Sequence, residues 1–322
     1  MRVFRRPRPT VPAVPSGCVA TIGVFDGVHL GHQRILERVL AVSVQQAVPS
    51  LVFSFEPTPQ EAMNPSNPPA RLMRLREKVL VLDAAGLDYL YCPPFEGALQ
   101  SLSPEEFIEH VLVQRLGVRH LVVGDDFRFA RRRAGTYAHL EAGGRQFGFG
   151  VEAVGGVTLA GQRVSSTAVR QALAAGDLER AQSLLGRPYR MVGRVSRGRQ
   201  LGRKLGFPTA NMRLDRRVSP VSGIFAVRIH GIDKVPRDAV ASVGTRPTVG
   251  GVEPLLEVYV FDFNGDLYGR QVAVDFVARL RDEARFDDLD ALRGQMERDA
   301  AKAREILANT NQCQQTDTRN RK

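Results

Sequence analysis

The chain has 322 residues, of which 43% are hydrophobic and 25% charged, a composition typical of a globular protein and a length that suits two domains. Its net charge of +11 predicts attraction to polyanions, which include nucleic acids and nucleotide phosphates alike. The scattered cysteines exclude a disulfide framework, and the lack of a signal-peptide pattern or of a run of ~20 apolar residues indicates a cytoplasmic protein that does not cross a membrane.

Short apolar runs alternate with helical stretches in the N-terminal half. The runs at 19–23, 50–55, 89–92 and 120–124 predict strands, and helices are predicted at 33–46, 72–85 and 104–116. Ser103 is the expected N-cap of the third helix. Alternation of this kind predicts a doubly wound, Rossmann-like α/β domain with a parallel sheet. Two short helices follow at 167–175 and 178–185, ended by Gly176 and Gly186.

After 187–188 the pattern changes to alternation of period two, at 224–229, 255–263 and 271–277. Strands without intervening helices predict a small antiparallel barrel or sandwich. Asn264 and Gly265 tolerate positive φ and predict a hairpin between the last two strands. A closing helix is predicted from about Asp288, and the residues at helical spacing on its expected inner face are Leu289, Leu292, Met296, Ala303 and Ile306.

The change of pattern places the domain boundary near Arg187. We therefore expect an N-terminal domain over 1–186 and a C-terminal domain over 187–308. The last residues, 309–322, are polar and aperiodic and are expected to form a frayed, disordered tail.

Glycines and histidines are concentrated between the first predicted strand and its helix. Gly23, Gly27 and Gly31 let the backbone approach a ligand closely, at the strand end where open parallel sheets bind ligands. His29 and His32 stand one helical turn apart, as donors to the oxygens of a phosphate under attack. The alternatives are two histidines of the core or the surface, or two zinc ligands, although the sequence suggests no third ligand nearby.

At these residues the chain resembles the nucleotidyltransferases with a His-x-Gly-His motif, and specifically the bacterial bifunctional riboflavin kinases/FMN adenylyltransferases, or FAD synthetases. The resemblance continues at 123–129 and at 164–170. In the second of these segments, hydroxyl groups at the start of a predicted helix and one arginine can hold phosphates. A plain N-cap with a solvated arginine is the alternative for the second segment. The resemblance implies that His29 and His32 are catalytic. It implies ATP binding by Gly23, Phe25, Asp26, Gly27, Gly31, Ser165, Ser166, Thr167 and Arg170, and FMN or adenine binding by Gly124, Asp126 and Arg128.

Three positions depart from the family pattern. Val24 replaces an asparagine, Thr58 a histidine and Ala130 a glycine. We expect these changes to affect the affinity for ATP or FMN, or the rate, rather than the class of reaction. Aminoacyl-tRNA synthetases use a related histidine motif, but their second, lysine-rich signature is missing here.

A second glycine-rich segment, 193–211, carries five cations and suits a loop that wraps phosphates. It is not a Walker loop, because no Gly-Lys-Ser/Thr sequence ends it. After Pro208 the chain should be extended, so that Thr209 and Asn211 present oxygen atoms on one face, as Mg²⁺ ligands together with nucleotide phosphates. A solvated loop and a structural turn are the alternatives.

This segment is similar to the Gly-Phe-Pro-Thr-Ala-Asn signature of riboflavin kinases, and the similarity extends through 243–248, 256–259, 262–269 and 281–286. It implies that Glu257 is the general base of a kinase, although a lone glutamate on a strand could equally face solvent. It also implies an ATP site at Gly193, Gly198, Lys204, Gly206, Thr209 and Asn211, Mg²⁺ at Thr209 and Asn211, and flavin contacts from Arg281 and Phe286.

The two resemblances together imply two ATP-dependent reactions in one chain. Riboflavin would be phosphorylated to FMN in the C-terminal domain, and FMN would be adenylylated to FAD in the N-terminal domain with release of pyrophosphate. The expected cofactor is Mg²⁺. The expected partners are ATP and flavins, without nucleic acid or a membrane, because no finger spacing or RNA-binding signature accompanies the basic residues. A nucleotidyltransferase with a nucleic-acid or tRNA substrate is the alternative, and a non-enzymatic RNA-binding or flavin-carrier protein is a further one.

Overall fold

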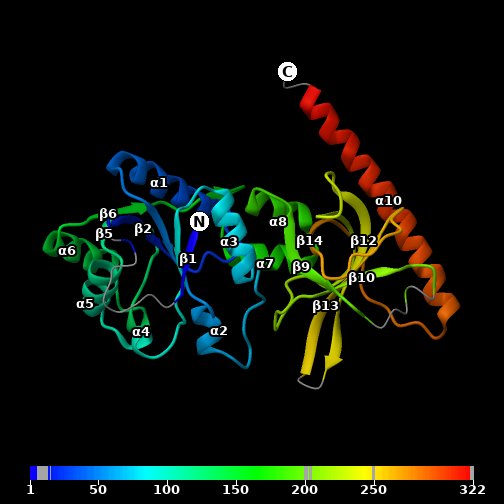
Figure 1. Cartoon of the computed structure of the whole chain (residues 1–322), viewed down its shortest axis with the longest axis horizontal. Coiled ribbons are helices and arrows are strands. Elements are labelled where there is room, and N and C mark those ends of the chain that lie inside the picture. Colours follow the sequence, from blue (N-terminus) through cyan, green and yellow to red (C-terminus); the bar gives the residue numbers. More distant parts are fainter. Residues whose placement is uncertain (6–13, 15, 199–201, 203–204, 249–250, 320–322) are drawn as a thin grey trace. The chain divides into compact units, whose positions relative to one another are not determined.

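The computed structural model describes residues 1–5, 14, 16–198, 202, 205–248 and 251–319 (Figure 1). By its internal contacts the chain forms two compact units, each with its own sheet and core. The first unit comprises Met1–Pro69 and Met73–Ser166, and the second comprises Ala70–Leu72 and Thr167–Lys322.

A parallel sheet of six strands forms the centre of the first unit, in the order β1-β4-β3-β2-β5-β6. From β2 the order runs outward through β3 and β4 on one side and through β5 and β6 on the other, which confirms the doubly wound topology. β2 and β3 are buried along their whole lengths, as expected of apolar strands covered on both faces. The strands are β1 (Arg2–Phe4), β2 (Cys18–Ile22), β3 (Ser50–Phe53), β4 (Tyr89–Tyr91), β5 (Val118–Gly124) and β6 (Gly150–Val154).

Helices and one small hairpin complete the first unit. The predicted helix at 104–116 is a short α-helix that continues as a π-helix, and Ser103 Oγ caps it by accepting the Glu106 N–H at 3.1 Å. The helices are α1 (Leu30–Gln46), α2 (Pro59–Met63), α3 (Leu75–Ala84), α4 (Ala98–Ser101), α5 (Pro104–Glu106), η1 (Phe107–Arg115), η2 (Arg131–Arg133) and α6 (Tyr137–Phe147), and the hairpin joins β7 (Thr158–Leu159) to β8 (Gln162–Arg163).

The edge strand β1 was not predicted from the sequence. Its three residues pair in parallel with β4, and the Phe4 and Tyr89 rings stack at 5.6 Å between centroids. The sequence here is basic and is interrupted by prolines a few residues later, so it has no pattern that predicts a strand of three residues. An ion pair of 2.6 Å between the Met1 ammonium group and Asp83 adds to the strand pairing and the ring contact.

The second unit contains a closed antiparallel barrel, which confirms the barrel alternative of the sequence prediction. Its strands follow one another around the barrel in the order β10-β13-β12-β11-β14-β9. The elements of this unit are α7 (Ser166–Ala175), α8 (Leu178–Leu185), β9 (Tyr189–Ser196), β10 (Thr209–Arg213), β11 (Gly223–His230), β12 (Arg237–Thr248), β13 (Gly251–Val260), β14 (Gln271–Arg281) and α10 (Leu289–Arg319).

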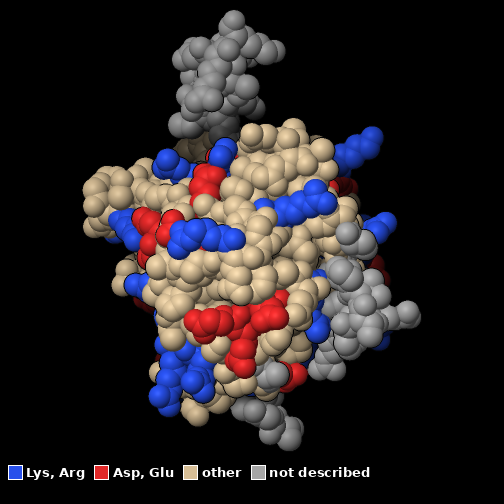
Figure 2. All heavy atoms as spheres, turned by 90° about the vertical axis from the view of Figure 1, so that its left-hand side faces the viewer, with Lys and Arg blue, Asp and Glu red and all other residues tan. Residues whose placement is uncertain are grey.

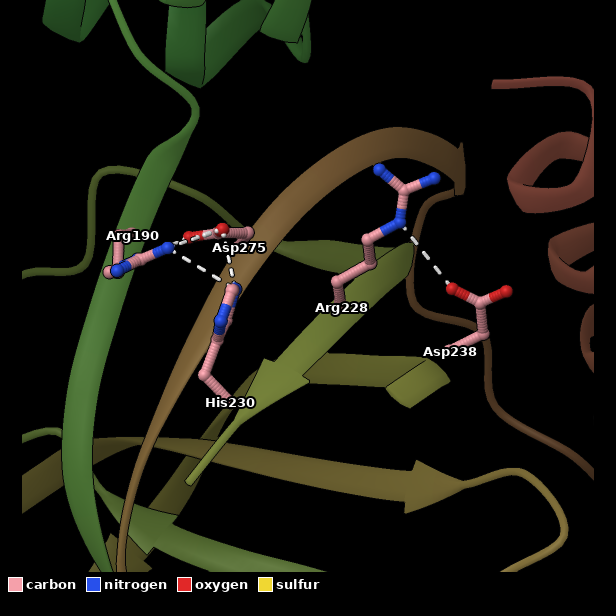
Figure 3. A network of polar contacts seen from close by, with 5 residues as sticks. All are labelled: Arg190, Arg228, His230, Asp238 and Asp275. Atoms are coloured by element: carbon pink, nitrogen blue, oxygen red, sulfur yellow. Dashed lines mark hydrogen bonds and ion pairs between the residues drawn. The ribbon is translucent and has the colours of Figure 1, made fainter. Parts of the chain in front are cut away.

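A polar network ties three neighbouring strands of the barrel together (Figure 3). Asp275 of β14 is only 7% exposed, and its two carboxylate oxygens accept hydrogen bonds from Arg190 of β9 at 2.5 and 2.7 Å. His230 of β11 places Nε2 at 2.8 Å from Asp275 Oδ2. Because a buried carboxylate is costly unless it is paired, this network compensates Asp275 on both sides.

The predicted hairpin at Asn264-Gly265 is wrong. The strands on either side, β13 and β14, are not neighbours in the barrel, since β13 pairs with β10 and β12 whereas β14 pairs with β11 and β9. The connection therefore crosses an end of the barrel. Its positive φ values occur at Asp262 and Gly269 instead.

The closing helix α10 packs on the barrel through Ala300, Ala303 and Leu307. The Asp288 carboxylate accepts the Ala291 N–H at 2.7 Å, so the helix begins where the sequence predicts. Leu289 is 55% exposed and does not belong to the inner face. α10 continues to Arg319, beyond residue 309, where the disordered tail is expected to begin. No proline or glycine follows Asn309 to end the helix.

The two short helices group with the barrel. The compact second unit begins at Thr167, ahead of the predicted boundary at Arg187. The buried face of α8 consists of Leu178, Ala181, Leu184 and Leu185. Tyr189 Oη, at the start of β9, donates to Leu72 O at 3.1 Å, a contact between the segment Ala70–Leu72 and the barrel within the second unit. The boundary between separable domains stays a prediction.

Candidate active sites

The loop after β2 lies at the switch point of the first sheet, between strands that run outward in opposite directions. The Gly23 N–H donates to Phe53 O at 3.0 Å, where the chain leaves the sheet. His29 is the N-cap of α1, and its Nδ1 accepts the His32 N–H at 3.4 Å. The predicted histidine motif is thus the strand-to-helix turn that the sequence indicates.

The two motif histidines are in contact. Their rings stack with centroids 3.7 Å apart, and the Phe25 ring lies 4.9 Å from that of His32. A Cβ on Gly31 would lie 3.3 Å from the His29 ring and 3.7 Å from Val164 O. Gly31 therefore allows the close approach of the histidine motif to the residues that precede Ser165.

The loop is attached to distant parts of the first unit through Asp26. The Asp26 carboxylate, 3% exposed, accepts the Met73 N–H at 2.9 Å, and Asp26 O accepts the Ser166 hydroxyl at 2.8 Å. The loop at 21–32 is therefore bonded directly to Ser166, in the part of the second motif that belongs to the same unit. Asp26, predicted to bind ATP, has at least one structural role as the acceptor of a backbone N–H.

Lys78 is a residue of this site that sequence reasoning missed. It is 1% exposed, and its Nζ donates to Val24 O at 2.7 Å and to Ser54 Oγ at 2.8 Å. Ser54 Oγ also donates to Val24 O at 3.0 Å. No pattern in the sequence marks Lys78, because a lysine in a predicted helix ordinarily faces solvent.

The end of β5 carries the second predicted group of the first unit. Phe127 N–H donates to Gly124 O at 3.1 Å, which turns the chain and exposes Asp126 and Arg128. Arg163 of β8 places one guanidinium nitrogen 2.6 Å from Asp125 and 3.1 Å from Asp126. The hydrogen bond from the Gly156 N–H lowers the pKa of the Asp125 carboxyl, and Arg163 lowers it further. This loop and the segment before Ser165 are thereby linked.

The departures at Thr58 and Ala130 have visible structural effects. Thr58 is the N-cap of α2, where its Oγ1 donates to Glu61 Oε2 at 2.9 Å and accepts the Glu61 N–H at 3.4 Å. Ala130 adopts φ 64° and ψ −173°, a region that glycine tolerates and other residues rarely occupy. Thr58 thus supports a helix start, and Ala130 holds a strained backbone.

Thr167 and Arg170, the remaining residues of the second phosphate motif, belong to α7 in the second unit. Arg170 Nε donates to Ala70 O at 2.6 Å. This contact holds the short segment Ala70–Leu72 within that unit.

A cavity of about 390 Å³ opens in the second unit. Five residues predicted for the kinase site line it: Thr209, Asn211, Glu257, Arg281 and Phe286. The lining also includes polar residues to which the sequence analysis gave no role: Ser242 and Asp299, and Thr245 and Glu283 within the segments 243–248 and 281–286. Their strands and α10 are separated in the sequence by long stretches, so only the closed barrel reveals that they share a cavity.

Register places the predicted base beside the predicted metal ligands. Asn211 of β10 pairs with Glu257 of β13, which pairs in turn with Ser242 of β12. Asn211 Nδ2 lies 3.3 Å from Thr209 O and 3.5 Å from Thr209 Oγ1. The amide and hydroxyl groups of these two residues therefore lie together at the cavity, as their alternation along an extended strand predicts.

The predicted glycines of this site have different positions. A Cβ on Gly198 would lie 2.5 Å from Asn211 Cγ, so the loop passes directly over that side chain. Gly193 lies within β9, where a Cβ would be 2.9 Å from Met212 Cε, and it is not part of the cavity lining. Gly206 has φ 86° and open space around it. Lys204 lies outside the described residues.

Arg281 is held by an ion pair at the cavity. Asp299 of α10 accepts hydrogen bonds from Arg281 Nε at 3.0 Å and from Nη2 at 2.6 Å, and the Phe286 ring centroid lies 5.9 Å from Arg281 Cζ. Burial raises the pKa of the nearby Glu283 carboxyl, and Arg281 partly opposes this rise. Arg281 thus joins the end of β14 to the closing helix.

Among the described residues, no group of three or more His, Cys, Asp or Glu side chains could hold a metal ion. The oxygens of Thr209 and Asn211 suit Mg²⁺, which takes few protein ligands when phosphates and waters complete its shell. A Cβ on Gly198 would lie only 2.5 Å from Asn211 Oδ1, so a glycine is needed at 198 for the loop backbone to pass beside this oxygen. These two residues therefore fit a magnesium ion bound together with a nucleotide.

The face shown in Figure 2 carries basic side chains interspersed with acidic ones. The positive net charge is thus not gathered into one continuous basic area on that face. In the part of the chain that the structure describes, no helix is both long and apolar enough to cross a membrane.

A parallel sheet with a histidine-glycine loop at its switch point and, in the same chain, a closed barrel with a cavity lined by polar and acidic side chains are typical of an enzyme with two sites. The family model of FAD synthetase matches residues 11–168, and that of riboflavin kinase matches residues 185–307. Together the two matches cover most of the chain, which therefore belongs to the family of bifunctional riboflavin kinases/FMN adenylyltransferases.

The relatives cover nearly the whole chain. The bifunctional riboflavin kinase/FMN adenylyltransferase of Escherichia coli K12 is 44% identical over 310 residues, 96% of this chain and 99% of that protein. The protein of the same name from Pseudomonas fluorescens is 48% identical over 293 residues, 91% of this chain and 94% of that one. A solved structure described as a macrolide-efflux protein from Streptococcus pneumoniae is 31% identical with a TM-score of 0.79, and covers 92% of this chain and 97% of that one.

Proposed function

We propose that this chain, a riboflavin kinase and FMN adenylyltransferase, makes FAD in two ATP-dependent steps at the two sites described above. The kinase uses the barrel cavity, and the adenylyltransferase uses the loop at the switch point of the first sheet. The observation that supports this division best is the register of the barrel, which sets Glu257 beside Asn211 in a cavity that Arg281 and Phe286 also line. The substrates are small molecules, and we expect the enzyme to work in the cytoplasm.

In the kinase, Glu257 is proposed to take the proton of the ribityl 5′-hydroxyl of riboflavin. The hydroxyl oxygen then attacks the γ-phosphorus of ATP, a new P–O bond forms, and the bond to ADP breaks. Arg281 and Phe286 are proposed to contact the flavin, and Gly198, Lys204 and Gly206 to belong to the ATP loop. The position of Gly193 inside β9 supports a role in packing against Met212 rather than contact with ATP.

Thr209 and Asn211 are proposed to hold Mg²⁺. When bound, this ion would neutralise negative charge on the phosphates of ATP. The protein residues would fix the position of the nucleotide in the cavity, and glycine at 198 would let the loop backbone lie against Asn211 without a clash.

In the adenylyltransferase, a phosphate oxygen of FMN is proposed to attack the α-phosphorus of ATP, with pyrophosphate as the leaving group. His29 and His32 would donate hydrogen bonds to the α-phosphate as its negative charge increases. Glycines 23, 27 and 31 would let the backbone approach the phosphates, and the motif at 164–170 would hold the leaving pyrophosphate. The Ser166–Asp26 hydrogen bond of 2.8 Å, which joins the two motifs, supports this assignment. Gly124, Asp126 and Arg128 are proposed for FMN or adenine.

One incubation tests the proposal. Purified protein with riboflavin, ATP and Mg²⁺ should form FMN and then FAD, with ADP and pyrophosphate as the other products. With FMN in place of riboflavin, FAD should form without ADP. Chromatography of the flavins and nucleotides separates FMN, FAD and ADP, and an enzymatic assay measures pyrophosphate. Failure to convert either flavin would contradict the proposed function.

A further inference from the structure

We propose that Lys78 is a positioning residue of the adenylyltransferase. By holding the Val24 carbonyl, Lys78 would present the Phe25 backbone N–H to the nucleotide phosphates. The inference rests on the proposed function of the first unit. It starts from a buried cation that neither the sequence motifs nor the proposed mechanism uses.

Lys78 is almost completely enclosed, with 1% of its surface exposed. Two hydrogen bonds from its ammonium group are directed at one place, Val24 O at 2.7 Å and Ser54 Oγ at 2.8 Å. Ser54, which is 0% exposed, donates to the same Val24 oxygen at 3.0 Å. Burying an ammonium group is costly. An apolar residue would fill this volume without that cost, so packing alone does not account for a lysine here.

The two bonds to Val24 O set the direction of the next N–H group. In a trans peptide the C=O and the following N–H point in opposite directions. With its carbonyl held by Lys78 and Ser54, the Val24–Phe25 peptide directs the Phe25 N–H away from Lys78. This N–H forms no hydrogen bond with any residue that the structure describes. Unpaired N–H groups in a buried backbone are rare, which indicates a donor reserved for a ligand.

The backbone at Phe25 needs such a constraint. Its φ of 49° lies in the left-handed region, which is uncommon for an aromatic residue. A flip of the Val24–Phe25 peptide would break both hydrogen bonds to Val24 O. The Phe25 ring, 1% exposed and 4.9 Å from the His32 ring, would then move against a proposed catalytic side chain. Lys78 therefore acts on both the amide and the histidine of this loop.

The test is Lys78→Met, which keeps the length of the side chain and removes the donor. Because loss of one oriented donor to a developing charge lowers kcat by about 10²-fold or more, FMN adenylylation should fall by that amount with a small change in KM for FMN. Riboflavin phosphorylation by the same protein should stay at the wild-type level. Ser54→Ala should give a smaller loss, and the double variant should lose less than the product of the two single losses, because both residues act on one oxygen.

Leu82→Ala is the matched control, since Leu82 is 0% exposed on the same helix and is not part of the lysine-serine-carbonyl contact. It should lower the melting temperature and leave kcat per folded molecule unchanged. An equal loss of kcat in Leu82→Ala at equal melting temperature would mean that Lys78 is merely structural and would overturn the proposal. Unchanged adenylylation in folded Lys78→Met would do the same.

A measurement without turnover separates this inference from the proposed function. In the wild type, a non-hydrolysable ATP analogue should shift the Phe25 amide resonance and slow its exchange with solvent. Lys78→Met should lose this response. If the wild type fails to adenylylate FMN, the proposed function is wrong. If the bound analogue changes neither the resonance nor the solvent exchange of the Phe25 amide, the role of Lys78 is wrong. If Lys78→Met does not fold, the wild-type amide response and Ser54→Ala decide the question.

Discussion

Asn211 and Glu257 are register partners on adjacent antiparallel strands of the barrel, β10 and β13. Side chains of paired residues project to the same face of a sheet. A proposed metal ligand and a proposed base are therefore held side by side by main-chain hydrogen bonds, at a cavity of about 390 Å³. Because the backbone pairing does not depend on either side chain, Asn211 or Glu257 can be substituted while the other keeps its place. Two experiments use this independence.

Glu257→Gln should keep the shape of the cavity and remove the base. FMN formation from riboflavin should fall by ~10²–10⁴-fold, the usual effect of losing general-base catalysis. Adenylylation of supplied FMN should continue, and Glu297→Gln, an exposed carboxylate on α10, should leave both rates unchanged. The measurement is the initial rate of each product by chromatography. Wild-type phosphorylation in Glu257→Gln would contradict the assignment.

Asn211→Leu removes an oxygen from the proposed magnesium site and places apolar volume beside the Gly198 backbone. The kinase should then need more Mg²⁺ and more ATP for half-maximal rate, because one ligand of the ion is missing and the loop is displaced. The adenylyltransferase activity of the same sample is the control. Titrations of Mg²⁺ at fixed ATP, and of ATP at excess Mg²⁺, give the two values. The same Mg²⁺ dependence as the wild type would exclude Asn211 as a ligand.

Ala130→Gly should stabilise the first unit. The strain of a non-glycine residue at φ 64° and ψ −173° is of order 1–3 kcal/mol, and the added freedom of glycine in the unfolded chain subtracts about 0.5–1 kcal/mol. A net gain of about 1 kcal/mol in the free energy of unfolding is expected. Ala134, four residues on at φ −69° and ψ −28°, is the control, and Ala134→Gly should destabilise by about 0.5–1 kcal/mol. Denaturant titration measures both, and the opposite order would contradict the strain at Ala130.

Two fragments of the C-terminal half distinguish the predicted boundary from the compact units. A fragment that begins at Thr167 keeps the buried face of α8, whereas one that begins at Arg187 lacks it. Loss of even one buried leucine removes about 1.5–3 kcal/mol of apolar burial, so the longer fragment should be the more stable by at least this amount. Thermal unfolding measures the difference, and both should phosphorylate riboflavin where they fold. Equal stability would show that the barrel does not need α8.

Much of the fold follows from local patterns that the structure confirms. The alternation of apolar runs and helices predicts the parallel sheet, and period-two segments predict the antiparallel barrel. The wrong hairpin prediction and the unpredicted strand both concern which strands pair, which depends on residues far apart in the sequence. Asn264-Gly265 has the composition of a tight turn, but the closure of the barrel decides which strands are neighbours. The short edge strand β1 depends on its partner β4.

The candidate sites show the same division. Residues within a motif, such as His29 and His32 or Thr209 and Asn211, are predicted because their spacing places them on one face of a helix or strand. Lys78 and Ser242 reach their sites through packing and strand register, respectively, and neither lies in a motif that predicts this. Gly193 illustrates the opposite case, since it stands in a glycine-rich segment and yet lies in a strand beside Met212.

Closure of the barrel also bears on how molecules of this protein can associate. Each of the six barrel strands has neighbours on both sides, so within the described residues the barrel offers no free strand edge to another chain. The sheet of the first unit does end, at β1 and at β6. Strand addition between copies, the first step of aggregation through sheets, would therefore have to begin in the first unit. The three residues of β1 provide only a short template there.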